Sequence, residues 1–84
     1  MNAAERDAFF DEVVSAVNDG KMTWGEAVRA LRVEVTGLNQ AAFARAVKIS
    51  ERTLRQLELD AGNPTLETLN AVLRPFGLKL GLRR

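Results

Sequence analysis

Hydrophobic residues recur every three to four positions along most of the chain, which is the spacing of one buried face of an α-helix. The first such stretch covers residues 4–17 and ends at an Asn-Asp-Gly turn over residues 18–20. The pattern predicts an amphipathic N-terminal helix with its acidic residues mainly on the other face. We interpret its apolar stripe as core, with a toxin or dimer contact as the alternative; the stripe consists of Phe9, Phe10, Val13, Val14 and Val17.

A second helix is predicted to start near Thr23. Thr23 and Glu26 have the spacing of a capping box, which satisfies two free amides at a helix start. Trp24, at this helix start, is interpreted as an anchor in the core or in a dimer. Gly37 ends the helix, and the predicted buried stripe between these limits is Ala27, Val28, Leu31 and Val35.

Two short helices follow, over residues 40–47 and 51–59. Asn39 can cap the first and Ser50 the second. A turn of about three residues joins them, which is the helix-turn-helix arrangement that places a second helix in the major groove of DNA. In the second helix Leu54 and Leu57 are expected to face the core.

The outward face of residues 51–59 carries side chains that suit DNA bases. With Leu54 inward, helical spacing leaves Glu51, Arg52, Arg55 and Gln56 outward. Arginine suits guanine, glutamine suits adenine, and glutamate can accept a hydrogen bond from cytosine N4. The alternative is an ordinary solvated helix face.

The last part of the chain changes period. After a loop over residues 60–64, Asn63 or Thr65 opens a further helix that carries Leu66, Leu69, Val72, Leu73 and Phe76 and ends at Pro75 and Gly77. Hydrophobic residues then alternate at Leu78, Leu80 and Leu82, which predicts a short β-strand. Because a single strand is unstable and no mate is visible in this sequence, the pattern indicates pairing with the same strand of a second chain.

Composition narrows the possible functions. The chain has 84 residues, no cysteine and no histidine, so thiolate metal sites and the commonest catalytic base are missing. Glycine-rich phosphate loops and nucleophile-base pairs are absent too, which argues against an enzyme and against a cofactor. No apolar run has the roughly 18 residues that cross a bilayer, and the acidic N-terminus does not resemble a signal peptide. We therefore expect a cytoplasmic protein without a membrane partner.

The net charge of +1 hides an uneven distribution. Residues 1–20 contain five acidic residues and one basic residue, a net charge of −4. Residues 21–84 contain eleven basic and six acidic residues, a net charge of +5. Such asymmetry indicates a polyanionic partner for the second segment only, with ordinary solvated charge as the alternative.

Residues 37–44 (GLNQAAFA), residues 49–54 (ISERTL) and Glu58 together resemble the Xre or lambda-repressor-like helix-turn-helix family. The resemblance covers residues 29–76. It implies a phosphate contact for Gln40 and contacts to bases or nearby phosphates for the residues that follow the turn. The DNA-binding set that we predict is Gln40, Lys48, Ser50, Glu51, Arg52, Thr53, Arg55 and Gln56.

The same resemblance implies an ion pair between Glu58 and an arginine of the preceding helix. Glu58 stands between two leucines on the core side, where a buried charge needs a partner. Arg32 is the first candidate and Arg29 the second. Four residues separate Arg32 from Gly37, whereas three are usual in the family.

Residues 62–69 (GNPTLETL), followed by a helix, Gly77 and a leucine-rich strand, resemble HipB- and HigA-type antitoxins. Such proteins repress their own operon as dimers and bind a toxin, and in HipB-type members the terminal strands of two chains pair. The resemblance implies a homodimer that contacts its partner through Leu78, Leu80 and Leu82, an inverted-repeat operator of double-stranded DNA, and a protein toxin.

The expected architecture is all-α, a lambda-repressor-like bundle of about five helices with a C-terminal strand that pairs across a dimer. We divide the chain into an acidic N-terminal helix (residues 1–20), a helix-turn-helix domain (21–77) and a dimerisation strand with a basic tail (78–84). The leading hypothesis is an autorepressing antitoxin. The alternatives are a stand-alone or phage-type regulator without a toxin, and a protein-interaction module whose basic helix binds an acidic partner.

Overall fold

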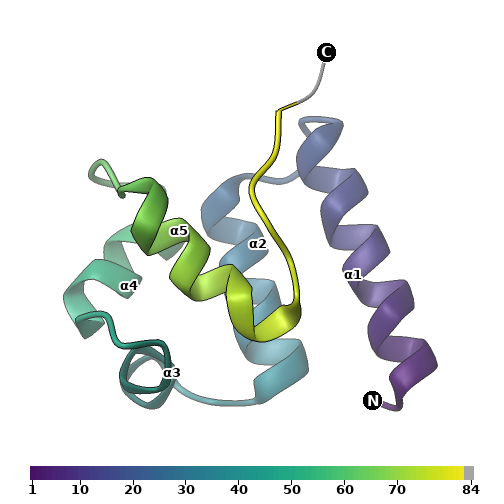
Figure 1. Cartoon of the computed structure of the whole chain (residues 1–84), viewed down its shortest axis with the longest axis horizontal. Coiled ribbons are helices and arrows are strands. Elements are labelled where there is room, and N and C mark those ends of the chain that lie inside the picture. Colours follow the sequence, from purple (N-terminus) through teal and green to yellow (C-terminus); the bar gives the residue numbers. More distant parts are fainter. Residues whose placement is uncertain (83–84) are drawn as a thin grey trace.

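The computed structural model describes residues 1–82 and consists of helices joined by short turns (Figure 1). Arg83 and Arg84, which belong to the predicted basic tail, lie outside the described residues. The elements in chain order are α1 (Ala3–Asn18), α2 (Trp24–Leu31), a π-helical turn (Arg32–Thr36), α3 (Gln40–Val47), α4 (Glu51–Glu58), α5 (Leu66–Leu73) and a 3₁₀ turn (Arg74–Phe76). The five predicted helices are therefore confirmed.

Each α-helix begins at a side chain that accepts a hydrogen bond from a backbone amide of the first turn. The caps predicted at Thr23, Asn39 and Ser50 are confirmed, and α5 begins at Thr65, one of the two candidates. Asn2 and Glu5 form a further capping box at α1, which the hydrophobic pattern does not reveal. Local sequence thus fixes where the helices start, because a cap satisfies amides that a helix cannot pair itself.

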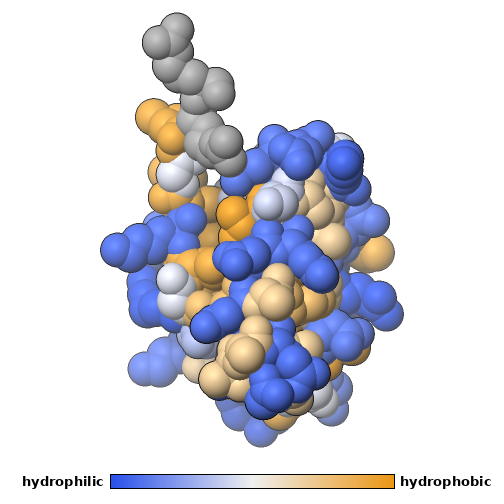
Figure 2. All heavy atoms as spheres, turned by 90° about the vertical axis from the view of Figure 1, so that its right-hand side faces the viewer, coloured by the Kyte–Doolittle hydropathy of each residue, from blue (hydrophilic) through white to orange (hydrophobic). Residues whose placement is uncertain are grey.

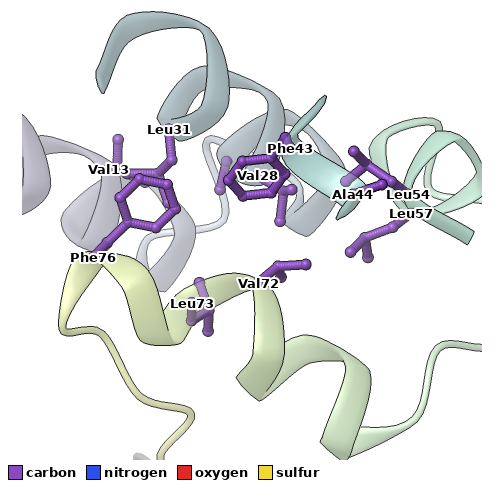
Figure 3. Packing of buried hydrophobic residues seen from close by; sticks show 11 residues of the cluster. Val13, Val28, Leu31, Phe43, Ala44, Leu54, Leu57, Val72, Leu73 and Phe76 are labelled. Carbon is purple, nitrogen blue, oxygen red and sulfur yellow. The ribbon is translucent and has the colours of Figure 1, made fainter. Parts of the chain in front are cut away.

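The core lies between α2, α3, α4 and α5, and α1 closes one side of it (Figure 3). Leu31 and Leu54 are completely buried, and Phe43 stacks against Phe76 with ring centroids 6.1 Å apart. Phe10 of α1 meets the other side of Phe76 edge-on, also at 6.1 Å. Phe76 therefore connects α1 to the helix-turn-helix, and the interpretation of the α1 stripe as core holds for Val13 and for its partly buried neighbours Phe9, Phe10 and Val17.

The pattern predicted one continuous helix from Thr23 to Gly37, but only its first part, to Leu31, is α-helical. It changes at Arg32 to a π-helical turn, in which the amide of Gly37 donates to the carbonyl of Arg32, five residues back. A π turn holds one residue more than an α turn. This turn accommodates the additional residue between Arg32 and Gly37, and Gly37 ends it in the left-handed conformation (φ 67°) that glycine adopts without strain.

The C-terminal segment, residues 78–82, runs over the core between α1 and α2 and does not form a β-strand within the described chain (Figure 1). The predicted strand is expected to pair with a second chain, so the single chain does not test that pairing, which stays a prediction. Leu78 and Leu80 instead pack against the chain's own core, whereas Leu82 is fully exposed.

Several large hydrophobic side chains that the pattern placed inside are exposed. Trp24 is 43% exposed, Val14 40% and Leu66 72%. Helical spacing identifies a face but not its width, so residues at the edge of the stripe remain outside. In the part of the chain that the structure describes, no helix combines the length and hydrophobicity needed to cross a membrane.

Candidate nucleic-acid interface

Helices α3 and α4 form a helix-turn-helix on the side of the molecule opposite α1 (Figure 1). Leu54 and Leu57 are buried against the core, as predicted, so the other face of α4 points to solvent. Glu51, Arg52, Arg55 and Gln56 are all exposed there. The structure therefore brings the four predicted base-reading side chains together on one helix face.

Two of these four side chains contact each other. The Arg55 guanidinium lies 3.5 Å from the Glu51 carboxylate, and both side chains are about half exposed. Exposed pairs at this helical spacing contribute about 0.3 to 0.5 kcal/mol, less than one good bidentate contact to a base. Because the pair is weak, a base edge can replace it at little cost.

Ser50 and Thr53 occupy the start of α4. The Ser50 hydroxyl accepts from the Thr53 amide at 3.0 Å and pairs with the Thr53 hydroxyl at 2.7 Å. Their main role in the free protein is therefore to cap the recognition helix. Thr53 is half-buried and Ser50 exposed, so the hydroxyl of Ser50 is the more accessible to a phosphate.

Lys48 lies in the turn between the two helices with φ at 63°. This left-handed conformation is strained for a residue with a β-carbon and is usually occupied by glycine at such a helix end. The side chain is exposed. A lysine at this position, which favours glycine, places a positive charge in the turn between α3 and α4.

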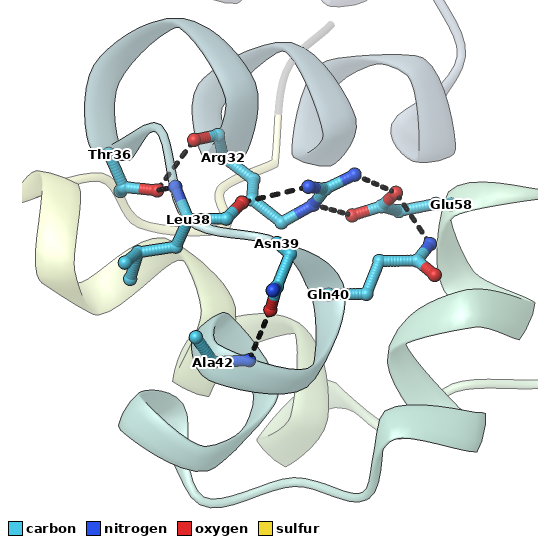
Figure 4. Close-up of polar contacts among 7 residues, drawn as sticks. All are labelled: Arg32, Thr36, Leu38, Asn39, Gln40, Ala42 and Glu58. Carbon is cyan, nitrogen blue, oxygen red and sulfur yellow. Dashed lines mark hydrogen bonds and ion pairs between the residues drawn. The ribbon is translucent and has the colours of Figure 1, made fainter.

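Gln40 and Glu58 belong to a buried network behind the helix-turn-helix (Figure 4). Arg32 donates from Nε to Glu58 Oε2 at 2.7 Å and from Nη2 to Glu58 Oε1 at 2.9 Å, and its Nη1 donates to the carbonyl of Leu38 at 2.9 Å. Gln40 Nε2 donates to Glu58 Oε1 at 3.1 Å. Of the two candidate arginines, Arg32 is the partner.

This network connects the π-helical turn, the loop before α3, α3 itself and α4. Arg32 and Glu58 are each only 8% exposed, and the Glu58 carboxylate raises the pKa of the Arg32 guanidinium although burial opposes the charge. Every buried polar side-chain atom within the described residues has a hydrogen-bond partner. One hydrogen of the Gln40 side-chain amide is thus donated to Glu58 inside the protein. The other hydrogen of this group remains to donate to a phosphate.

A second junction, which the sequence analysis did not anticipate, joins the end of α4 to the start of α2. The carboxylate of Asp60 accepts from the Thr23 hydroxyl at 2.6 Å and from the Gly25 amide at 2.8 Å. Gly25 is buried, and a β-carbon there would lie 2.6 Å from the carbonyl oxygens of Leu57 and Glu58. The acceptor at Asp60 could not be foreseen because it comes from a residue 35 positions away.

A shallow pocket beside Gln56 does not follow from the hydrophobic pattern. It lies between α4 and the start of α5 and is lined by Thr53, Gln56, Leu57, Ala61, Asn63, Pro64, Thr65 and Thr68. The sequence predicted a helix start at Asn63 or Thr65, and the structure shows that this start borders the recognition helix.

Comparison with known families identifies the class of protein. A helix-turn-helix family model matches residues 28–82, more than half of the chain. The chain belongs to the Xre or lambda-repressor-like helix-turn-helix family, whose members are DNA-binding transcription regulators. Neither the curated proteins nor the solved structures include a significant match.

Proposed function

We propose that this protein is a transcriptional repressor that binds an inverted-repeat operator as a homodimer and serves as the antitoxin of a toxin-antitoxin operon. The observation that carries the DNA-binding part is the exposed face of α4, where Arg52, Arg55 and Gln56 stand together on a helix held by the Arg32–Glu58 pair. These side chains have the donor geometry that guanine and adenine edges require.

Replacement of Arg52 or Gln56 by alanine tests whether α4 reads bases. Each change is expected to cost about 1 to 3 kcal/mol of affinity for the preferred operator while binding to unrelated duplex changes little. Titration of operator and random duplexes by fluorescence anisotropy measures both affinities. Equal losses on the two duplexes would show that these residues do not read sequence.

The salt dependence of duplex binding separates this function from a protein-interaction module. Phosphate contacts release counterions, so the affinity for DNA should fall linearly on a logarithmic scale as salt rises. A basic helix that binds an acidic protein instead would leave duplex affinity negligible at every salt concentration. The titration is run on the full chain at four salt concentrations.

Dimerisation is supported by the C-terminal segment. Among the described residues, only the amide of Leu78 in this segment donates to the backbone elsewhere, namely to Leu73. Within residues 1–82, the backbone of residues 79–82 has no backbone hydrogen-bond partner, which leaves an edge that can pair with another strand. We propose that the segments of two copies pair antiparallel across a two-fold axis. Sedimentation of the full chain at micromolar concentration should give twice the monomer mass.

The antitoxin role is supported by the resemblance of residues 62–69 and the leucine-rich segment to HipB- and HigA-type proteins. Co-expression with the product of each neighbouring reading frame tests it: a toxic neighbour should lose its toxicity and copurify with this protein. If no neighbour is toxic, the protein is a stand-alone regulator, and the DNA-binding proposal is unaffected.

A further inference from the structure

An apolar groove runs between α1, the start of α2 and the C-terminal segment. Its floor consists of buried core residues such as Val13, Ala27 and Leu31, and its rims carry Val14 and Trp24. In Figure 2, which faces α1, hydrophobic surface appears between the C-terminal segment and the hydrophilic outer surface of α1. The groove has a volume of about 200 Å³.

This volume favours side chains of a protein over a small ligand. Binding sites for small molecules usually measure about 300 to 1,000 Å³, whereas a cavity of about 150 Å³ holds a single benzene-sized group. The groove therefore accepts one or two leucine-sized side chains. DNA is an unsuitable occupant because the neighbouring helix α1 belongs to a segment with a net charge of −4.

The face of α1 that borders the groove continues, outside the groove lining, into two carboxylates. Asp7, Asp11, Val14 and Asn18 follow one another at spacings of four, three and four residues, so they lie along one face of α1. Val14 and Asn18 of this row line the groove. The last turn of α1 contains no basic residue, and Asp19 follows it, so the partial negative charge of that helix end is also unbalanced.

The C-terminal segment has the complementary properties. Leu82 is fully exposed, and within residues 1–82 neither ion pair involves Lys79. The segment thus offers a leucine without a pocket and a lysine without an ion-pair partner, beside an apolar groove and the acidic outer face of α1. Lys79 itself lies in the wall of this groove. In its own chain the segment forms a wall of this groove, so it cannot also fill it.

We infer that the groove receives the C-terminal segment of a second copy, so that the acidic helix α1 of each chain binds the basic segment of its partner. This inference rests on the proposed dimer and adds a role for α1. Antiparallel pairing along the free backbone of residues 79–82 places the partner's segment between this segment and α1. Its exposed Leu82 enters the groove, and its Lys79 approaches the acidic face of α1. The two α1 helices then lie on opposite sides of the paired segments, which keeps their like charges apart.

A charge exchange between chains tests this arrangement. One variant carries Asp11→Lys and the other Lys79→Glu, and each alone is expected to weaken dimerisation about tenfold, since both symmetric contacts change from attraction to repulsion. An equimolar mixture of the two variants should recover dimers, because only the heterodimer has opposite charges at both contacts. Sedimentation equilibrium measures the dissociation constants.

Glu12→Lys is the matched control, because Glu12 lies next to Asp11 in sequence but about 100° further round the helix, away from the groove. It should leave dimerisation unchanged. Leu82→Ser should weaken dimerisation at least tenfold without lowering the melting temperature of the monomer, because this side chain makes no contact in the single chain.

The outcomes separate the two proposals. Recovery in the mixture, with an inert Glu12→Lys, supports the contact in trans. A stable wild-type dimer that is insensitive to Asp11→Lys, or a mixture that stays dissociated, overturns the role of α1 and leaves the dimer intact. A wild-type chain that is monomeric at micromolar concentration overturns both.

Discussion

At the scale of single residues, Glu58 is the acceptor at the centre of the polar network behind the recognition helix. Its two oxygens accept three hydrogen bonds, two from Arg32 and one from Gln40. A buried carboxylate of this kind contributes most when all its donors are present, because removal of one charge leaves the other without compensation. The pair therefore joins α4 to the π-helical turn after α2, and Gln40 connects the same carboxylate to α3.

Glu58→Ala is expected to destabilise the protein by about 3 to 5 kcal/mol, because Arg32 is left charged and buried. Urea unfolding followed by circular dichroism measures the change. Glu51→Ala, which breaks the exposed pair with Arg55, should cost no more than about 0.5 kcal/mol. A double change of Arg32 and Glu58 to methionine and leucine should recover most of the lost stability. Equal effects of the two single alanine changes would contradict a structural role for the pair.

Lys48 combines backbone strain with a charge, and two substitutions separate these properties. Lys48→Gly should raise the free energy of unfolding by about 1 kcal/mol, because glycine adopts the left-handed conformation without a steric penalty. Both Lys48→Gly and Lys48→Ala should weaken binding to all duplexes and lower the salt slope by about one. Unfolding and duplex titrations are compared for the two variants. An unchanged salt slope would mean that Lys48 does not contact a phosphate.

At the scale of elements, the start of α2 fits directly against the end of α4. Gly25 permits this contact because it has no β-carbon, and Asp60 supplies the acceptor for its amide. This junction and the Arg32–Glu58 pair both hold α4 at its C-terminal end, where Glu58 is the last helical residue. The recognition helix is thus anchored at this end by two sets of contacts that do not involve its outward face.

Gly25→Ala is expected to destabilise the protein by about 1 to 3 kcal/mol, because the new methyl group would overlap two carbonyl oxygens of α4. Helix propensity alone predicts the opposite, a gain of about 1 kcal/mol for alanine. The reverse exchange at an exposed site of α1, Ala8→Gly, serves as the reference and should cost about 1 kcal/mol. Thermal unfolding of both variants measures these changes in stability. A gain in stability for Gly25→Ala would show that α2 and α4 can move apart at this contact without cost.

At the scale of the whole molecule, the DNA-facing helices and the C-terminal segment lie on different sides, so one copy can bind DNA and a second copy together (Figure 1). Removal of residues 78–84 would test dimerisation only together with stability, because Leu78 and Leu80 are part of the chain's own packing. A substitution at the exposed Leu82 isolates the contact between copies.

A two-fold dimer should require half-sites about 34 Å apart, one turn of DNA. Insertion of about five base pairs between the half-sites turns one of them to the opposite side of the duplex, so affinity should fall to the level of a single half-site. Insertion of a full turn of DNA should return both half-sites to the same side of the duplex, but the distance between them stays larger than in the operator. Anisotropy titrations with the three duplexes measure this, and affinity that is independent of the spacing would indicate independent monomers.

The sequence by itself determined the helices, their caps and the outward face of α4. These features depend on contacts within a few residues, namely the capping of amides and the helical period of Leu54 and Leu57. The ion pair of Glu58 followed from the cost of a buried charge together with the family resemblance, and its first candidate partner, Arg32, is confirmed.

Only the tertiary structure decided the features that join distant residues. The π-helical turn, which sets the direction of Arg32, arises where an additional residue must fit between two packed ends. The support of Gly25 by Asp60 and the packing of Leu78 and Leu80 on their own core depend on elements that meet after the chain has folded. An alternating pattern predicts which side chains share a face, but it does not predict what packs against that face. In the single chain, the chain's own core covers Leu78 and Leu80 of this face.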